Sequence, residues 1–122
     1  KEEMERKQAY LKSCITTRKI DLSMHDSSTS FLEAVFAKGD RRLGAVLESA
    51  YKKGCKFDSW TECFDLQKWN EAFRECGIDP DFYSLRTRDY TEINPWDHLD
   101  YAVTKDFLIK ENKEAHVQFK GP

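Results

Sequence analysis

The sequence lacks the motifs that most directly assign a function to a chain of 122 residues. It contains no glycine-rich phosphate loop, no GxSxG and no HExxH, and its three histidines are too dispersed in sequence to indicate a metal site. No apolar run approaches the ~20 residues that a membrane-spanning helix requires, and no stretch resembles a signal peptide. We therefore expect a soluble, cytoplasmic chain that has no membrane partner.

The cysteines and the charged residues are spread along the chain and do not form clusters. The four cysteines form no CxxC pair; they are Cys14, Cys55, Cys63 and Cys76. A zinc ribbon or a redox motif is not indicated, so we expect free thiols in a reducing compartment and no metal site in this chain. The formal charge is −2, with both signs interspersed along the chain. This balance does not favour nucleic-acid binding.

Apolar periodicity predicts a mainly α fold of five or so helices. Start signals are a capping-box pattern at Ser30 and cap residues at Asp40, Asp65 and Thr104. Glycine marks the ends of the inner helices. The expected helices run over residues 2–18, from Ser30 to Gly39, from Asp40 to Gly54, from Asp65 to Gly77, and from Lys105 to about Val117.

One short strand is expected at residues 20–24, where apolar Ile20, Leu22 and Met24 alternate with polar residues. A lone strand cannot satisfy its own backbone. Its partners must therefore lie outside the chain, or the run stays extended without pairing. Because the sequence also begins with a charged run and no Met, we expect a fragment of a larger α/β protein. Its predicted parts are residues 1–29, a helix plus strand, and residues 30–122, a helical extension.

His25 and Asp26 are the first candidate site residues, because they directly follow the predicted strand. Sites gather at the carboxyl ends of strands in α/β folds. The alternative is structural, with Asp26 and the following serines making cap and turn hydrogen bonds while His25 packs over the strand end.

Arg41 and Arg42 are candidates because they are predicted to lie in the first turn of the middle helix, where a cation is disfavoured by ~0.3–1 kcal/mol. They require an anionic partner, either a carboxylate of this chain, a neighbouring domain or a ligand. Asp97 is the expected partner, and Asp100 is the second candidate. It lies with His98 in the irregular stretch 86–100, which is either pinned by side-chain hydrogen bonds or is a binding loop.

Five stretches taken together resemble a known family: LSMHD, SFLEAVFAKGDRRLG, KFDSWTECFDLQKW, GIDPDFY and NPWDHLD. They are similar to the part that follows the radical core in an uncharacterised family of radical S-adenosylmethionine (SAM) proteins. These proteins carry a cobalamin-binding-like domain upstream and are often joined to a radical SAM-linked domain. The resemblance covers residues 12 to about 111. Met24 stands where the family tends to have an aromatic residue, and Lys38 where it favours Arg.

The resemblance implies that the full-length iron-sulfur protein binds a 4Fe-4S cluster and SAM, with cobalamin implied by the upstream domain, and performs radical chemistry in a partial α/β barrel. Residues 20–24 would be a strand at the end of the barrel, with His25 and Asp26 near its mouth. The cluster-binding CxxxCxxC is absent from this sequence. The chain is therefore expected to be a non-catalytic, structural or substrate-proximal C-terminal segment whose partner is the rest of the same polypeptide.

Two other functions remain open from the residues alone. One is an autonomous helical module that binds a partner protein or RNA through Arg41, Arg42 and residues 94–98. The other is a small stand-alone enzyme that uses His25 and Asp26 as an acid-base pair. The substrate of the full-length protein does not follow from the sequence.

Overall fold

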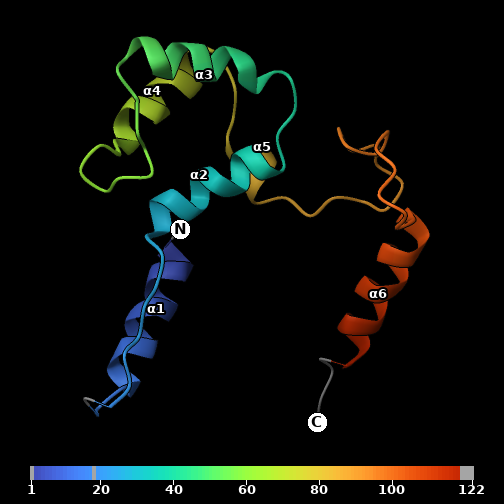
Figure 1. Ribbon diagram of the computed structural model, residues 1–122, viewed down its shortest axis with the longest axis horizontal. Coiled ribbons are helices and arrows are strands. Elements are labelled where there is room, and N and C mark those ends of the chain that lie inside the picture. Colours follow the sequence, from blue (N-terminus) through green and yellow to red (C-terminus); the bar gives the residue numbers. More distant parts are fainter. Residues whose placement is uncertain (1, 18, 119–122) are drawn as a thin grey trace. The chain divides into compact units, whose positions relative to one another are not determined.

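The computed structural model describes residues 2–17 and 19–118 (Figure 1). Within these residues it forms six helices: α1 Glu2–Cys14, α2 Ser27–Ala37, α3 Leu43–Lys52, α4 Leu66–Glu75, α5 Asp81–Ser84 and α6 Lys105–Gln118. The prediction of a mainly α fold is confirmed. The chain divides into two compact units, residues 1–86 and 87–122. The predicted division after residue 29 stays a prediction.

The predicted strand at residues 20–24 does not form, and no strand occurs in the described parts of the chain. The run lacks a ladder partner and passes beside α1, whose Gln8 Nε2 donates a hydrogen bond to the His25 carbonyl at 2.9 Å. A single side-chain bond cannot replace a β ladder. Within the described residues the run is therefore unpaired, and pairing with a partner outside the chain stays a prediction. α1 itself ends at Cys14, before the predicted end at Arg18, which lies outside the described residues.

Two predicted helix starts are wrong because Asp side chains cap the backbone at other positions. α2 begins at Ser27, three residues before the capping-box pattern. Asp26 Oδ1 accepts hydrogen bonds from the backbone amides of Ser28 and Thr29 and so caps the helix there. α3 begins at Leu43 and not at Arg41. Asp40 Oδ1 accepts from the Arg42 amide at 2.9 Å, which forms a turn ahead of the helix. Arg41 and Arg42 thus precede α3.

The other predicted helix signals are confirmed. Asp65 Oδ1 accepts from the Gln67 amide at 3.0 Å at the start of α4. Gly77, with φ of 63°, follows the end of the same helix. Thr104 Oγ1 accepts from the Phe107 amide at 3.2 Å at the start of α6. These signals act between near neighbours in sequence, so the sequence displays them directly.

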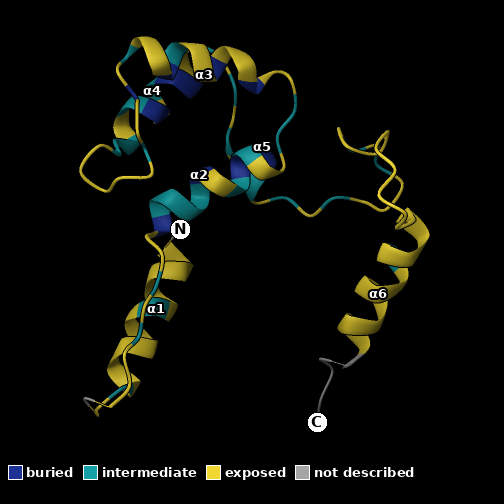
Figure 2. Ribbon diagram, in the orientation of Figure 1, coloured by how far each residue is buried: buried dark blue, intermediate teal, exposed yellow. Residues whose placement is uncertain are grey.

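The core of the first unit lies among α2, α3, α4 and α5, where Figure 2 shows the buried residues in dark blue. α3 packs against α4, and α2 packs against α5. The Trp69 ring meets Phe36 edge-on, with ring centroids 5.4 Å apart. The buried apolar residues are Leu32, Val35, Leu43, Val46, Ala50, Cys55, Trp69, Ala72, Phe73 and Tyr83.

Residues 87–117 of the second unit form no such core. No side chain from Thr87 to Val117 is buried, and Ile109 on α6 is the half-buried apolar residue among them. The loop 87–104 is instead organised by hydrogen bonds of its own side chains. In the described part of the chain, no helix has the length and the apolar content needed to cross a membrane.

Candidate functional site

Asp26 acts as the cap of α2. Its Oδ1 accepts from the amides of Ser28 at 2.8 Å and Thr29 at 3.0 Å. Ser27 is buried and donates through Oγ to Glu5 Oε1 at 2.7 Å. His25 is exposed. Asp26 and the following serines thus make the cap and turn hydrogen bonds of the structural alternative. A carboxylate held by backbone amides is poorly placed to act as a base with His25.

Arg42 pairs with Asp40, only two residues before it. Its Nη2 lies 2.6 Å from Asp40 Oδ2 and its Nε lies 3.0 Å from Oδ1, a two-point contact between guanidinium and carboxylate. This pairing holds the pKa of Asp40 at about 2, below its ordinary 3.8, and raises the pKa of Arg42. Arg42 has therefore found its anion locally, which removes the reason for expecting Asp97 as its partner.

Two aromatic rings complete the Arg42 environment. The guanidinium carbon lies 5.5 Å from the Phe82 ring centroid and 5.6 Å from that of Tyr83. Tyr83 is buried, and its hydroxyl donates to Asp40 Oδ1 at 3.2 Å. Burial raises the pKa of this phenol. Arg41, by contrast, is exposed, and its guanidinium has no hydrogen bond or ion pair to any described residue.

Asp97 organises the loop of the second unit. Its Oδ2 accepts from the Asn94 amide at 2.9 Å and from Lys105 Nζ at 2.8 Å. Lys105 Nζ also donates to the Glu92 carbonyl at 2.7 Å. The Lys105 hydrogen bond is the main cause that lowers the pKa of Asp97. The irregular stretch is thus pinned by side-chain hydrogen bonds, one of its two predicted roles. His98 beside it is exposed.

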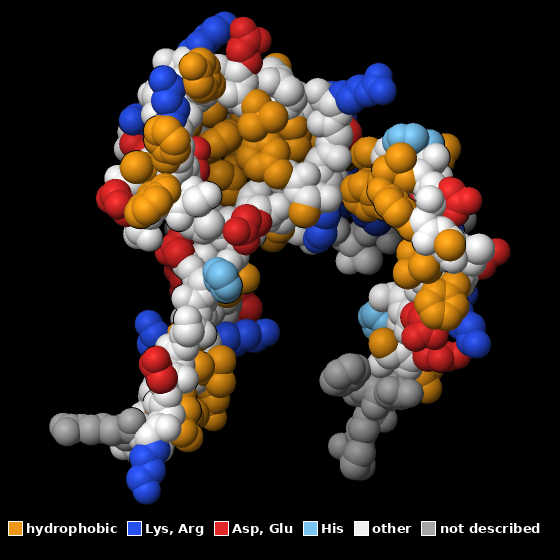
Figure 3. Space-filling model, in the orientation of Figure 1, with side chains coloured by type: hydrophobic (Ala, Val, Ile, Leu, Met, Phe, Trp, Pro, Cys, Tyr) orange, Lys and Arg blue, Asp and Glu red, His pale blue; other side chains and the backbone are white. Residues whose placement is uncertain are grey.

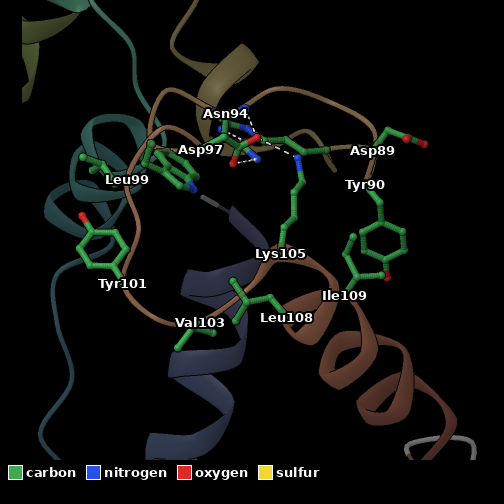
Figure 4. A pocket seen from close by; sticks show the side chains of 12 residues that line it. Asp89, Tyr90, Asn94, Asp97, Leu99, Tyr101, Val103, Lys105, Leu108 and Ile109 are labelled. Atoms are coloured by element: carbon green, nitrogen blue, oxygen red, sulfur yellow. Dashed lines mark hydrogen bonds and ion pairs between the residues drawn. The ribbon is translucent and has the colours of Figure 1, made fainter.

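A pocket of about 390 Å³ lies within this second unit (Figure 4). Arg88 helps to build it by donating to Asn94 Oδ1 at 2.7 Å and by lying 5.2 Å from the Trp96 ring centroid. The polar lining residues are Arg88, Asp89, Asn94, Asp97 and Lys105. The apolar and aromatic ones include Tyr90, Trp96, Leu99, Tyr101, Val103 and Leu108.

The chemistry that these groups support is binding. Asp97 is already held by an ammonium and an amide, so it is a weak candidate for a general base. The cysteines are free, and in residues 2–17 and 19–118 no three or more His, Cys, Asp or Glu side chains come together as metal ligands. The sequence-predicted residues thus separate into Asp26 and Arg42, which have structural partners in the first unit, and Asp97, which lines the pocket.

Sequence reasoning missed Lys105, Arg88 and Tyr101 as site residues. The sequence places Lys105 at the start of the last helix and predicts no role for its side chain. The available signal was composition, because residues 88–108 combine four aromatic side chains with charges of both signs and no helical period before Thr104. Such a stretch must fold around its own side chains. Comparison with protein-family models, curated proteins and solved structures gave no match for the chain.

Proposed function

We propose that this chain is a non-catalytic C-terminal segment of a radical SAM iron-sulfur enzyme, and that it packs on the rest of that polypeptide. The observation that carries the proposal is the apolar surface of α1 and of the unpaired stretch after it. The resemblance of the five sequence motifs supplies the family. We also propose that the protein is cytoplasmic. All four cysteines are free, and the cytoplasm keeps thiols reduced.

The surface of α1 supports a covering partner. The helix has no buried residue, yet it carries Met4, Tyr10 and Leu11, which are 44%, 68% and 50% exposed. Ile20 in the following stretch is 57% exposed. Figure 3 shows hydrophobic side chains, in orange, along the part of the chain that holds α1. Contiguous apolar side chains of this kind mark a surface that another structure covers.

The unpaired stretch 20–24 adds a second reason. In the described residues its backbone makes no ladder, and its apolar side chains still alternate with polar ones. A run of this pattern gains backbone hydrogen bonds when it joins the edge of a sheet. The barrel of a radical SAM enzyme would offer such an edge. His25 and Asp26 would then lie close to the barrel.

The cofactors belong to the upstream part in this proposal. A 4Fe-4S cluster needs clustered thiolates. Here Cys55 is buried, Cys76 is half-buried, and Cys14 and Cys63 are exposed, and the described residues contain no group of metal ligands. These residues do not fit a cluster. In this proposal SAM, and cobalamin if the upstream domain holds it, bind to the remainder of the protein.

The coding sequence upstream of Lys1 is the first test. A CxxxCxxC motif there is expected, and an unrelated domain or a start codon at this position would refute the proposal. The longer protein, reconstituted anaerobically with iron and sulfide, should bind iron and cleave SAM. This 122-residue chain, treated in the same way, should take up no stoichiometric iron.

A pair of variants tests the role of α1. Leu11→Asp should weaken association of this chain with the separately expressed upstream part, because it places a charge in the proposed interface. Its melting temperature should stay unchanged, since Leu11 is half exposed. Lys12→Asp, at the exposed next position, is the control and should bind normally. Equal binding by the unmodified chain, Leu11→Asp and Lys12→Asp would show that α1 is not part of the interface.

A second candidate function is an autonomous module that binds a partner protein or RNA. The apolar exposure of the second unit favours it, since Ile93, Tyr101 and Val117 are each at least 70% exposed. A complex with an unrelated partner in the absence of any upstream radical SAM part would support this candidate over the first.

A further inference from the structure

We propose that the pocket of residues 88–109 binds a small, neutral, planar aromatic molecule that carries an amide or lactam group. This inference is independent of the proposed function, because the pocket lies wholly within the second unit and needs no iron, SAM or upstream sequence. It follows from the size, the walls, the charge balance and the hydrogen-bonding groups of the pocket.

The size and the walls fit one small aromatic molecule. A volume of about 390 Å³ lies in the lower part of the ~300–1,000 Å³ typical of small-molecule sites. Tyr90, Trp96 and Tyr101 contribute rings, and Val103 and Leu108 contribute aliphatic surface. Figure 4 shows Val103 and Leu108 on the opposite side of the pocket from Asn94 and Asp97. A ligand would therefore have an apolar body and one polar end.

The charge balance selects a neutral ligand. Two cations, Arg88 and Lys105, and two carboxylates, Asp89 and Asp97, line the pocket. Lys105 lies 2.8 Å from Asp97, so their charges offset one another. The two cations and two carboxylates of the lining sum to no net charge, so a charged ligand would lose hydration on entry without gaining a net counter-charge. A neutral ligand avoids that cost.

The polar end offers one donor and one acceptor side by side. Lys105 Nζ donates two hydrogen bonds to described residues, to Asp97 Oδ2 and to the Glu92 carbonyl. An ammonium has three N–H donors, so one remains for a ligand carbonyl. Among the described residues, Asp97 Oδ1 accepts a single long bond of 3.4 Å, from Asn94 Nδ2, and it can accept a ligand N–H. A carbonyl next to an N–H is the pattern of an amide or lactam.

Benzamide is the probe that tests this assignment. Titrated into the 15N-labelled 122-residue chain, it should produce saturable amide shifts confined to residues 88–109, with a Kd on the order of 1 mM for a fragment of its size. Benzoate replaces the N–H with a charge, and cyclohexanecarboxamide keeps the amide but loses the planar ring. Both should bind at least about tenfold more weakly than benzamide.

Two matched variants test the location. Leu108→Trp fills the pocket and should weaken benzamide binding by about tenfold or more. Phe107→Trp adds the same ring at the neighbouring position of α6, outside the lining, and should leave the Kd within about twofold. Non-saturating shifts, equal binding of benzoate, or equal affinity of Leu108→Trp would each overturn the proposal. The comparison of the three ligands on the unmodified chain decides the question even if a variant does not fold.

Discussion

Lys105 Nζ lies 2.8 Å from Asp97 Oδ2, and this contact ties the first turn of α6 to the irregular loop before it. The two residues are eight positions apart, and the same ammonium also reaches the Glu92 carbonyl at 2.7 Å. One side chain therefore fixes two points of a loop that has no hydrophobic core beneath it. The shape of the pocket depends on this contact.

Lys105→Met should loosen the loop. The Asn94 amide, which donates to Asp97 Oδ2 at 2.9 Å, should then exchange its hydrogen severalfold faster, because the carboxylate that accepts it is no longer held. Lys110→Met, which removes an exposed pair with Glu114 on the same helix, is the control and should not alter that exchange. Native-state hydrogen exchange by NMR measures both. Unchanged protection of Asn94 in Lys105→Met would contradict the role of Lys105.

Trp69→Ala should be among the most damaging substitutions in the first unit. Trp69 is 6% exposed, packs on Phe36, and donates through Nε1 to Asp58 at 3.4 Å. Its removal should cost ~3–5 kcal/mol of unfolding free energy. Trp60→Ala removes a ring that is 62% exposed and should change stability by less than about 0.5 kcal/mol. Urea denaturation compares the two, and similar losses would mean that Trp69 is not part of the core.

Gly39→Ala and Gly44→Ala should act in opposite directions. A Cβ at Gly39 would collide with the Leu43 side chain and lie 3.0 Å from the Val35 carbonyl oxygen, so we expect a loss of ~1–3 kcal/mol. Gly44 is the second residue of α3, and a Cβ there meets nothing within 4 Å. Alanine should therefore stabilise the helix by ~0.5–1 kcal/mol. Thermal unfolding of both variants measures the signs, and a shared sign would contradict the packing around Gly39.

Asp40 should make stability depend on pH in the acid range. Its pKa is lowered to about 2 in the folded chain from an ordinary 3.8. The stabilisation is therefore complete above about pH 4 and is lost as the pH falls towards 2. We expect about 1 kcal/mol, since Arg42 is more than half exposed and the pair is partly screened.

The Asp40→Asn variant isolates this contribution. The difference in unfolding free energy between the unmodified chain and Asp40→Asn should shrink between pH 4 and pH 2. Glu62→Gln, at an exposed loop position, is the control. Its difference in unfolding free energy from the unmodified chain should stay constant between pH 4 and pH 2. A difference for Asp40→Asn that is constant over this range would mean that Asp40 is not stabilised by Arg42.

The four thiols should differ in reactivity. Cys14 and Cys63 are exposed, whereas Cys55 is buried and burial raises its pKa, so less of it is present as the reactive thiolate. Brief maleimide labelling followed by peptide mass spectrometry should find Cys14 and Cys63 modified and Cys55 protected. All four should react alike in denaturant. Rapid labelling of Cys55 in the native chain would contradict its place in the core.

The sequence by itself determined the helical class and those ends of helices that depend on near neighbours. Asp65, Gly77 and Thr104 act on backbone groups a few positions away, so their patterns are visible without a structure. The predicted helix start at Ser30 is wrong because the sequence offers two possible cap residues close together. Ser30 and Asp26 both offered a plausible cap, and the structure uses the one that lets Ser27 reach Glu5 on α1.

Only the tertiary structure decided which charges meet and where a pocket forms. Arg42 meets Asp40 through the local turn before α3, but only the tertiary structure brings the Tyr83 hydroxyl, 43 positions along the chain, onto the same carboxylate. Asp97 meets Lys105 because the loop folds back on the first turn of α6. Residue type fixes what a side chain can bond to, but the path of the backbone fixes which partner lies within the short reach of a hydrogen bond.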